Sequence, residues 1–323
     1  MNQLVSVIIP AKDAEKTIEK CIISLLGIDY QNFEVIIIDD GSQDKTAEIL
    51  GNYVQKIKII TNANCLGPSE ARNTAARQAR GELVAFTDAD CIVDKNWLKE
   101  LLEGFRRSPE VVSCGGTQEI PEDESQFGRS VAKFFKKTGF FTDYMRKAKG
   151  SLMEVGHNPS CNVMYRREVF LKEDGFLAGL WPGEDVELDY RLRKKGYKLI
   201  FNPQAIVYHY RLANLKAFLR MMFRYGQAQG FLVRKYGLFR QLHFLAIFSP
   251  VLLVLCLAGL LLNARLTLAL IILFFIVVRL SFSSLAPLGL FAWFYGFFIG
   301  RLFRNCFICR EITSSNTIGQ YRF

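Results

Sequence analysis

Apolar residues in the N-terminal part of the chain follow two different spacings. Short, nearly continuous runs of valine, isoleucine and leucine predict buried β-strands at residues 4–10, 33–40, 56–61 and 83–87. Apolar residues at helical spacing predict helices at residues 14–26, from residue 45 onward, and at residues 69–79. Strands that alternate with helices in this way predict an α/β fold, in which a mostly parallel, Rossmann-like sheet is covered by helices on both faces.

The middle of the chain continues this pattern and then changes. A helix is predicted to open at residues 182–185 and to end at Lys195, and the apolar strand after it ends at His209. Residues 214–237 then repeat apolar positions at helical spacing, with lysine and arginine between them. Basic amphipathic helices of this kind lie in the headgroup plane of a membrane, so we expect interface helices within residues 213–240.

Three long apolar segments follow, at residues 243–262, 266–285 and 286–303. The first has no charged residue and is long enough to cross a hydrocarbon core of roughly 30 Å. Basic residues lie both before the first segment and after the last, and both groups should stay in the cytoplasm, which favours an even number of crossings. We therefore expect two or three transmembrane or re-entrant helices within residues 241–305.

The positive charge is confined to the C-terminal third of the chain. The formal net charge is +10, but residues 211–323 hold 13 basic residues against one acid, whereas residues 1–210 hold 28 against 30. Because these basic residues bracket apolar segments, they fit an anionic membrane surface, and we expect no nucleic acid partner. The first apolar run is too short for a secretory signal. We expect a multi-pass protein of the cell membrane, with residues 1–212 and a basic tail at residues 306–323 in the cytoplasm.

Carboxylates follow three of the predicted strands at the point where each strand ends. Asp13 follows the first strand, Asp39 and Asp40 close the second, and Asp88 and Asp90 come directly after residues 83–87. Any one of these acids alone would be read as a turn or helix-cap residue. The carboxyl ends of parallel strands share one edge of a sheet, where ligands bind, so the acids should gather there. Oxygen ligands in this arrangement predict a divalent cation, Mg²⁺ or Mn²⁺, bound together with substrate phosphates.

The chain resembles the family 2 glycosyltransferases of the GT-A fold over roughly residues 4–210. The stretches that carry the resemblance are VSVIIPAKDAEKTIEKCIISLL, VIIIDDGSQDKT, GPSEARNTAARQARGELVAFTDADC and GEDVELDYRLRKKGYKLIFNPQAIVYHY. The resemblance implies a glycosyltransferase (a hexosyltransferase) that transfers a sugar with inversion from a nucleotide-activated donor, a UDP- or GDP-sugar. It also implies a divalent metal cofactor.

The same resemblance assigns donor-side roles to five residues near the first two strand ends. Pro10, Ala11 and Asp13 would line the nucleoside pocket. Asp39 would meet the base, and Asp40 would support that loop.

Four further residues are assigned to the nucleotide and the metal. Asp88 would touch the ribose or the metal, and Asp90 would ligate the metal that bridges the diphosphate. Arg72 would face the nucleotide, although a surface arginine on a helix is the alternative. His209 would be a third metal ligand or else an ordinary hydrogen-bonded histidine.

The Glu184-Asp185 pair is the candidate catalytic centre. Acids in a first helical turn are favoured by the helix dipole alone, so both residues can also be simple caps. The resemblance makes Asp185 the general base that takes the proton of the acceptor hydroxyl, and Glu184 a residue that binds or orients the acceptor. We expect Glu187 and Asp189, further along the helix, to be solvated. Residues that fall in the family's acceptor-side segment are Asn158, Ser160 and Asn162.

The basic amphipathic stretch suggests how the acceptor is reached. Arg220 and Arg224 either anchor the protein to lipid or contact a phosphate of the donor or of a lipid. Processive relatives carry a QxxRW element in the corresponding place, and this sequence has RYGQAQG there instead. We therefore expect a membrane-anchored, non-processive enzyme that acts on a lipid-linked glycan acceptor. The alternatives are a polyprenyl-phosphate monosaccharide synthase and a catalytically silent membrane scaffold.

Overall fold

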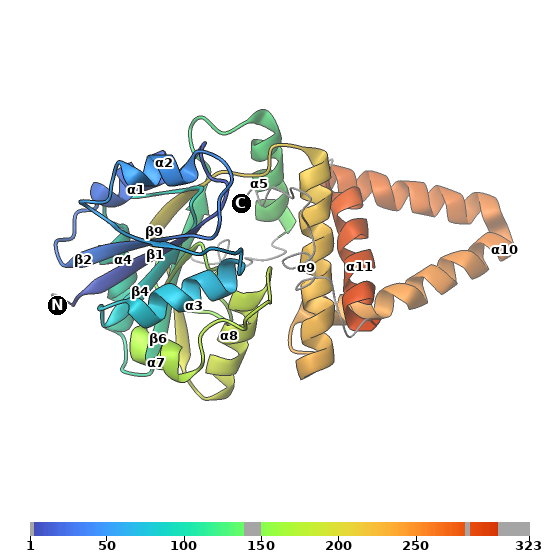
Figure 1. Cartoon of the computed structure of the whole chain (residues 1–323). Coiled ribbons are helices and arrows are strands. Elements are labelled where there is room, and N and C mark those ends of the chain that lie inside the picture. The colour runs from blue at the N-terminus through green and yellow to red at the C-terminus, as the bar shows by residue number, and fades with distance from the viewer. Residues whose placement is uncertain (1–2, 139–149, 282–284, 303–323) are drawn as a thin grey trace. The chain divides into compact units, whose positions relative to one another are not determined.

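The protein is described here by a computed structural model that covers residues 3–138, 150–281 and 285–302 (Figure 1). Its described residues form two compact units. The first lies within residues 1–124 and 144–211, and the second within residues 125–143 and 212–306. The predicted tail at residues 306–323 lies outside the described residues, as do residues 282–284 and 303 of the predicted apolar segments.

A mixed β-sheet forms the centre of the first unit. Its strands are β1 (Val5–Ala11), β2 (Phe33–Asp39), β3 (Lys58–Thr61), β4 (Leu83–Thr87), β5 (Cys91–Val93), β6 (Val111–Glu119), β7 (Met153–Glu154), β8 (Asn162–Arg166) and β9 (Lys198–His209). They are ordered β3-β2-β1-β4-β8-β6-β9-β5, and β7 pairs with β9. The four N-terminal strands are parallel, as the sequence predicted. Antiparallel pairings begin at β8, which lies between β4 and β6.

Helices cover both faces of this sheet, which confirms the α/β fold. The helices of the first unit are α1 (Ile18–Leu26), α2 (Thr46–Gly51), α3 (Pro68–Gln78), α4 (Trp97–Phe105), α7 (Arg167–Lys172) and α8 (Glu184–Lys194). On one face Val7 and Ile9 of β1 belong to a core with residues of α1 and α4. On the other face Ile8 belongs to a core with residues of α3, α7 and α8 (Figure 1). Successive strand residues point to opposite faces, so a strand buried on both faces must be apolar throughout.

The helix that was expected at residues 14–26 begins only at Ile18, because residues 12–17 form a loop over the end of β1. Asp13 in this loop has a φ of 50°, in the left-handed region that aspartate tolerates better than most residues. The loop thus places Asp13 near the end of β2, where Asp13 N donates to Ser42 Oγ at 3.0 Å.

The second unit is helical. Its helices are α5 (Gln126–Thr138), α9 (Leu215–Tyr236), α10 (Gln241–Ser281) and α11 (Ala286–Leu302). Helices α9 and α11 approach closely at four glycines, Gly226 and Gly230 of α9 and Gly296 and Gly300 of α11. A Cβ atom on any of the four would come within 2.0 Å of a backbone carbonyl oxygen of the other helix. Small residues at this spacing allow two helix backbones to touch.

The first predicted apolar segment and residues 266–281 of the second lie on α10, which is interrupted between them at Asn263, where φ is −152° and ψ is 86°. The third segment forms α11. Over the part of the chain that the structure describes, no helix combines the length and the apolar character that a membrane crossing needs. The expected membrane helices therefore remain a prediction.

Candidate active site

The carboxyl ends of β1, β2 and β4 share one edge of the sheet, and the predicted acids lie there. In the parallel register Ala11 pairs with Asp39, and Ile8 pairs with Phe86 one residue before the end of β4. Most of the acids that follow these ends are nearly inaccessible to solvent: Asp39, Asp40, Asp88 and Asp90 are 3–7% exposed. Buried carboxylates need hydrogen-bond donors or cations, so their partners define the site.

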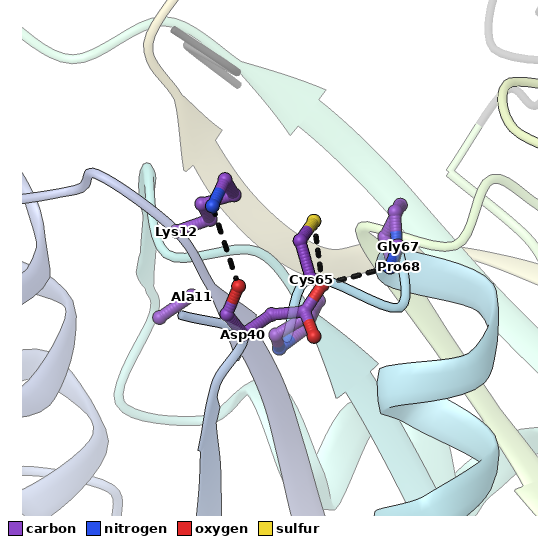
Figure 2. Close-up of a pocket in the computed structure, with 7 residues that line it drawn as sticks. Ala11, Lys12, Asp40, Cys65, Gly67 and Pro68 are labelled. Atoms are coloured by element: carbon purple, nitrogen blue, oxygen red, sulfur yellow. Dashed lines mark hydrogen bonds between the residues drawn. The ribbon is translucent and has the colours of Figure 1, made fainter. Parts of the chain in front are cut away.

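A small pocket opens at the ends of β1 and β2 (Figure 2). It is lined by Pro10, Ala11, Lys12, Asp40, Cys65, Gly67 and Pro68. Lys12 Nζ donates to the carbonyl oxygen of Gly41 at 3.0 Å, which holds this side chain over the end of β2. Two of the predicted nucleoside residues, Pro10 and Ala11, are thus in the pocket wall.

The other three residues predicted for this region act within the loops. The Asp40 carboxylate accepts hydrogen bonds from the backbone N–H groups of Leu66 and Gly67 at 2.8–3.2 Å, so its oxygens hold the loop before α3. Asp39 Oδ1 accepts from the N–H of Ser42 at 2.9 Å. Asp13 Oδ1 accepts a hydrogen bond from the N–H of Gln43, the residue after Ser42, at 2.7 Å. These three acids connect the loops that surround the pocket.

Arg72 on α3 joins two carboxylates from distant parts of the chain. Its Nη2 lies 2.5 Å from Asp88 Oδ1, and its Nη1 lies 2.9 Å from Glu184 Oε1. The residue is only 1% exposed, so the alternative of a surface arginine is wrong. The planar guanidinium can serve two acceptors at fixed angles, and here it links the loop after β4 to the start of α8.

The two acids at the start of α8 lie in different environments. Glu184 is buried and also accepts from Ser160 Oγ at 3.1 Å. Burial and the neighbouring Asp185 carboxylate raise the pKa of Glu184 to about 7, although the positive charge of Arg72 opposes the shift. The Asp185 side chain is 15% exposed, against 3% for Glu184, and its Oδ2 accepts from Ser160 N at 3.0 Å. Asp185 is therefore the acid of the pair that a second substrate can reach.

The expectation that Glu187 and Asp189 are solvated is wrong. Both are fully buried, although they point to different sides of α8. Glu187 forms an ion pair with Arg191 at 2.9 Å. Asp189 Oδ2 lies 3.0 Å from Nδ1 of His157, a residue for which the sequence suggested no role. The apolar spacing of this helix is weak, so the sequence did not reveal which of its acids face inward.

Asp90 and His209 face each other at the end of β5. Cys91 pairs with His209 in the antiparallel register of β5 and β9, and His209 Nε2 lies 3.3 Å from Asp90 Oδ1. Burial alone would lower the pKa of His209, but the Asp90 carboxylate outweighs this effect and raises it to about 10. Neither carboxylate oxygen of Asp90 has a hydrogen-bond partner among the described residues, although both are buried. The charge partner of Asp90 is thus the His209 imidazole, and a bound cation could supply the remaining ligand contacts.

The ligand set around this position fits a divalent metal. Asp90, Cys91 and His209 each offer a ligand atom, and these atoms lie within 4.8 Å of one another. Burial raises the pKa of the Cys91 thiol far above its usual range, which makes it a poor ligand at neutral pH. One carboxylate and one imidazole remain, and of these the carboxylate suits Mg²⁺ or Mn²⁺. Asp88, the other predicted ligand, has one oxygen engaged by Arg72.

Two residues beside His209 were missed by the sequence analysis. Gln118 Oε1 lies 3.4 Å from His209 Nδ1, so it can accept a hydrogen bond from Nδ1–H and leave Nε2 as a metal ligand. Arg211 donates to the same Gln118 oxygen at 3.1 Å, and its Nε is buried without a hydrogen-bond partner in the described part of the chain. Arg211 follows His209 by two residues, and residues two apart on an extended chain lie on the same face. This spacing was the one signal in the sequence that pointed to Arg211.

The remaining predicted residues lie around or outside this site. Asn158 and Asn162 are fully buried and brace the sheet, for example by the bond from Asn158 Nδ2 to the Ile200 carbonyl oxygen at 3.0 Å. Arg220 and Arg224 belong to α9 in the second unit.

Comparison with known proteins shows which class of enzyme has this fold and site. The sequence pattern of glycosyl transferase family 2 matches residues 6–172, about half of the chain. The chain therefore belongs to glycosyl transferase family 2, has the GT-A fold and is a glycosyltransferase.

Several characterised proteins are similar to it. A dolichyl N-acetyl-alpha-D-glucosaminyl phosphate 3-beta-D-2,3-diacetamido-2,3-dideoxy-beta-D-glucuronosyltransferase of Methanococcus voltae is 27% identical over 72% of this chain and 74% of its own length. A UDP-Glc:alpha-D-GlcNAc-diphosphoundecaprenol beta-1,3-glucosyltransferase of Escherichia coli is 36% identical over 41% of this chain and about half, 52%, of its own length. A mannosyltransferase of Pyrobaculum calidifontis, solved with GDP-Man and Mn²⁺, superposes with a TM-score of 0.71 at 18% identity. The superposition covers 94% of this chain and 88% of the Pyrobaculum chain.

Proposed function

We propose that this glycosyltransferase is membrane-anchored, non-processive and metal-dependent. It transfers a sugar with inversion from a UDP- or GDP-sugar to a lipid-linked glycan at the cytoplasmic face of the cell membrane. The product would serve cell-envelope polysaccharide or glycoconjugate synthesis. One observation carries the proposal: the buried Asp90 carboxylate is paired with His209 and has no hydrogen-bond donor among the described residues, at the sheet edge where ligands of α/β folds bind.

The donor would bind across this edge of the sheet. The pocket walled by Pro10 and Ala11 would take the nucleoside, with Asp13 and Asp39 in the loops that shape it. Asp88, held by Arg72, lies after the neighbouring strand and would meet the ribose or the metal. A nucleotide-sugar donor is supported by the Pyrobaculum enzyme, which shares the fold and was solved with GDP-Man and Mn²⁺.

The diphosphate would bind between the metal site and Arg211. Asp90 and His209 would hold Mn²⁺ or Mg²⁺, which when bound would neutralise the charge of the departing diphosphate. Arg211 contributes a further positive charge, and its Nε, which has no hydrogen-bond partner among the described residues, would donate to a phosphate oxygen. Gln118 orients both residues by accepting from Arg211 and contacting His209.

Asp185 would act as the general base. An inverting transfer needs a base on the side of the sugar opposite the leaving group, where it takes the acceptor proton as the new bond forms. Asp185 is more exposed than Glu184 and is oriented by the N–H of Ser160. Glu184 holds Arg72 and Ser160, so it would position both the donor-side and the acceptor-side groups.

The second unit supports a lipid-linked acceptor. Large apolar side chains are exposed along α10 and α11: Phe244, Phe248, Val254, Leu255, Leu261, Leu262, Leu268, Ile272, Leu273, Leu288, Phe291 and Tyr295. Apolar surface of this extent marks a site of contact with a membrane or a partner. The names of the Methanococcus and Escherichia relatives specify dolichyl phosphate and diphosphoundecaprenol acceptors. Arg220 and Arg224 of α9 would contact lipid or diphosphate headgroups.

The test is a product analysis with the full chain in detergent. The enzyme is incubated with Mn²⁺, a panel of UDP- and GDP-sugars and total membrane lipid. We expect a lipid-extractable glycoside whose anomeric configuration is inverted relative to the donor. A product in which the sugar is attached directly to polyprenyl phosphate would support the synthase alternative. Nucleotide binding without turnover of any donor would support the silent scaffold.

A further inference from the structure

Two carboxylates of α8 flank one imidazole ring. Asp185 and Asp189 are four residues apart and therefore lie on the same face of the helix. His157, in the loop after β7, places Nδ1 3.0 Å from Asp189 Oδ2 and Nε2 4.0 Å from Asp185 Oδ2. The ring thus stands between the proposed base and a second, fully buried carboxylate for which the proposed reaction has no role so far.

Asp189 determines how the ring is oriented. Its carboxylate also accepts from the N–H of Asn158 at 2.7 Å and from the hydroxyl of Tyr165 at 3.0 Å. A carboxylate that gathers donors in this way also accepts the Nδ1–H of His157. Fixing the proton on Nδ1 leaves the lone pair of the neutral ring on Nε2, directed toward Asp185.

We propose that His157 is a positioning and proton-relay residue for Asp185, an inference that rests on the proposed function. As the acceptor oxygen bonds to the sugar C1, the bond from C1 to the diphosphate oxygen breaks, and the diphosphate keeps the electron pair. The acceptor proton moves to Asp185 Oδ2 and then to His157 Nε2, which restores the Asp185 carboxylate. The Asp189 carboxylate stabilises the imidazolium, and the 12% of the His157 side chain that is exposed allows the proton to leave to water.

The charges around the ring favour this relay. Among the described residues, the titratable groups that face His157 or its loop are Asp185, Asp189 and Arg193 of α8 and, through Asp189, Tyr165 of β8. Two acids thus contact the ring, and the one nearby cation bonds the loop backbone. The 4.0 Å gap to Asp185 is typical of catalytic contacts that tighten only when substrate is bound.

The first test needs no substrate. The chain contains three histidines, so the NMR signals of His157 can be assigned by comparison with the His157→Asn variant. We expect the neutral ring to carry its proton on Nδ1. A proton on Nε2 would overturn the relay.

The second test is kinetic and uses release of nucleoside diphosphate from the UDP- or GDP-sugar that the product analysis selects, with membrane lipid as acceptor. His157→Asn keeps a donor for Asp189 but removes the base at Nε2. We expect kcat to fall by a factor of ten or more, part of the roughly 10²- to 10⁴-fold effect of a positioned base. The acidic limb of the pH profile should move to lower pH, and imidazole should restore turnover to His157→Ala.

Tyr165→Phe is the matched control, because it removes one donor to Asp189 and leaves Nε2 in place. It should keep the acidic limb of the wild-type enzyme. If His157→Asn also keeps the acidic limb of the wild-type pH profile, and imidazole does not restore turnover to His157→Ala, then His157 only braces its loop and the relay is wrong. Loss of turnover in Asp185→Asn in the same assay would then leave the proposed function standing. Full turnover in Asp185→Asn would overturn both the relay and the assignment of the base.

Discussion

The guanidinium of Arg72 lies 2.5 Å from the carboxylate of Asp88, and both side chains are buried. The two residues come from α3 and from the loop after β4, and Glu184 engages the other arm of the guanidinium at 2.9 Å. Removing one member of a buried ion pair leaves an uncompensated charge in a dry environment.

Arg72→Met should therefore destabilise the protein by about 3–5 kcal/mol, because Asp88 and Glu184 would stay buried without their cation. The measurement is the free energy of unfolding from chemical denaturation. Arg77→Met is the control on the same helix, since Arg77 is an exposed partner of Glu70 and its pair should contribute less than about 1 kcal/mol. Equal effects of the two substitutions would show that the buried network does not hold the site together.

Metal binding should depend on pH through His209. Burial alone would lower the pKa of this imidazole, but the Asp90 carboxylate beside it raises the pKa to about 10. At neutral pH Nε2 therefore carries a proton. A metal ion must displace that proton, so affinity should rise by up to about tenfold per pH unit below the pKa. Titration with Mn²⁺ between pH 6.5 and 8.5 measures the slope. His209→Gln should bind Mn²⁺ more weakly and lose the slope, and an affinity of the wild type that is constant over this range would rule out His209 as a ligand.

Stability should fall as the pH rises through the range in which Glu184 titrates. Burial and the Asp185 carboxylate raise its pKa to about 7 in the folded protein, from an ordinary value of 4.5. Between these values the folded state holds a proton that the unfolded state has lost, so each increase in pH costs stability until the folded pKa is passed.

Glu184→Gln removes this titration, so its stability relative to the wild type should increase between pH 5 and pH 7.5. The difference in unfolding free energy between the two proteins at each pH is the quantity to measure, because all other titrating groups cancel. A difference that does not change with pH would mean that Glu184 is already ionised at pH 5.

The parallel half of the fold and the edge that carries the acids could be predicted from the sequence. Strands β1 and β4 are buried on both faces, so their composition alone identifies them, and parallel strands bring their carboxyl ends to one edge. Asp39, Asp40, Asp88 and Asp90 are therefore placed at a common edge by the sequence alone.

The antiparallel half could not be predicted in the same way. Strand β8 inserts between β4 and β6 through pairings such as Phe86 with Val163, which join residues far apart in the chain. The inward face of α8 was also hidden, because charged residues occupy both of its sides. The contact between His157 and Asp189 therefore depends on tertiary packing that no local pattern records.

The central claim is that Asp185 is the base of an inverting glycosyl transfer. Asp185→Asn keeps the shape of the side chain and an oxygen that can accept from Ser160 N, so folding and nucleotide affinity should hardly change. The decisive measurement is the turnover number of this variant with the donor and membrane lipid that the wild-type enzyme uses. The account predicts a fall of roughly 10²- to 10⁴-fold, the usual contribution of a positioned general base. Turnover equal to that of the wild type would contradict it.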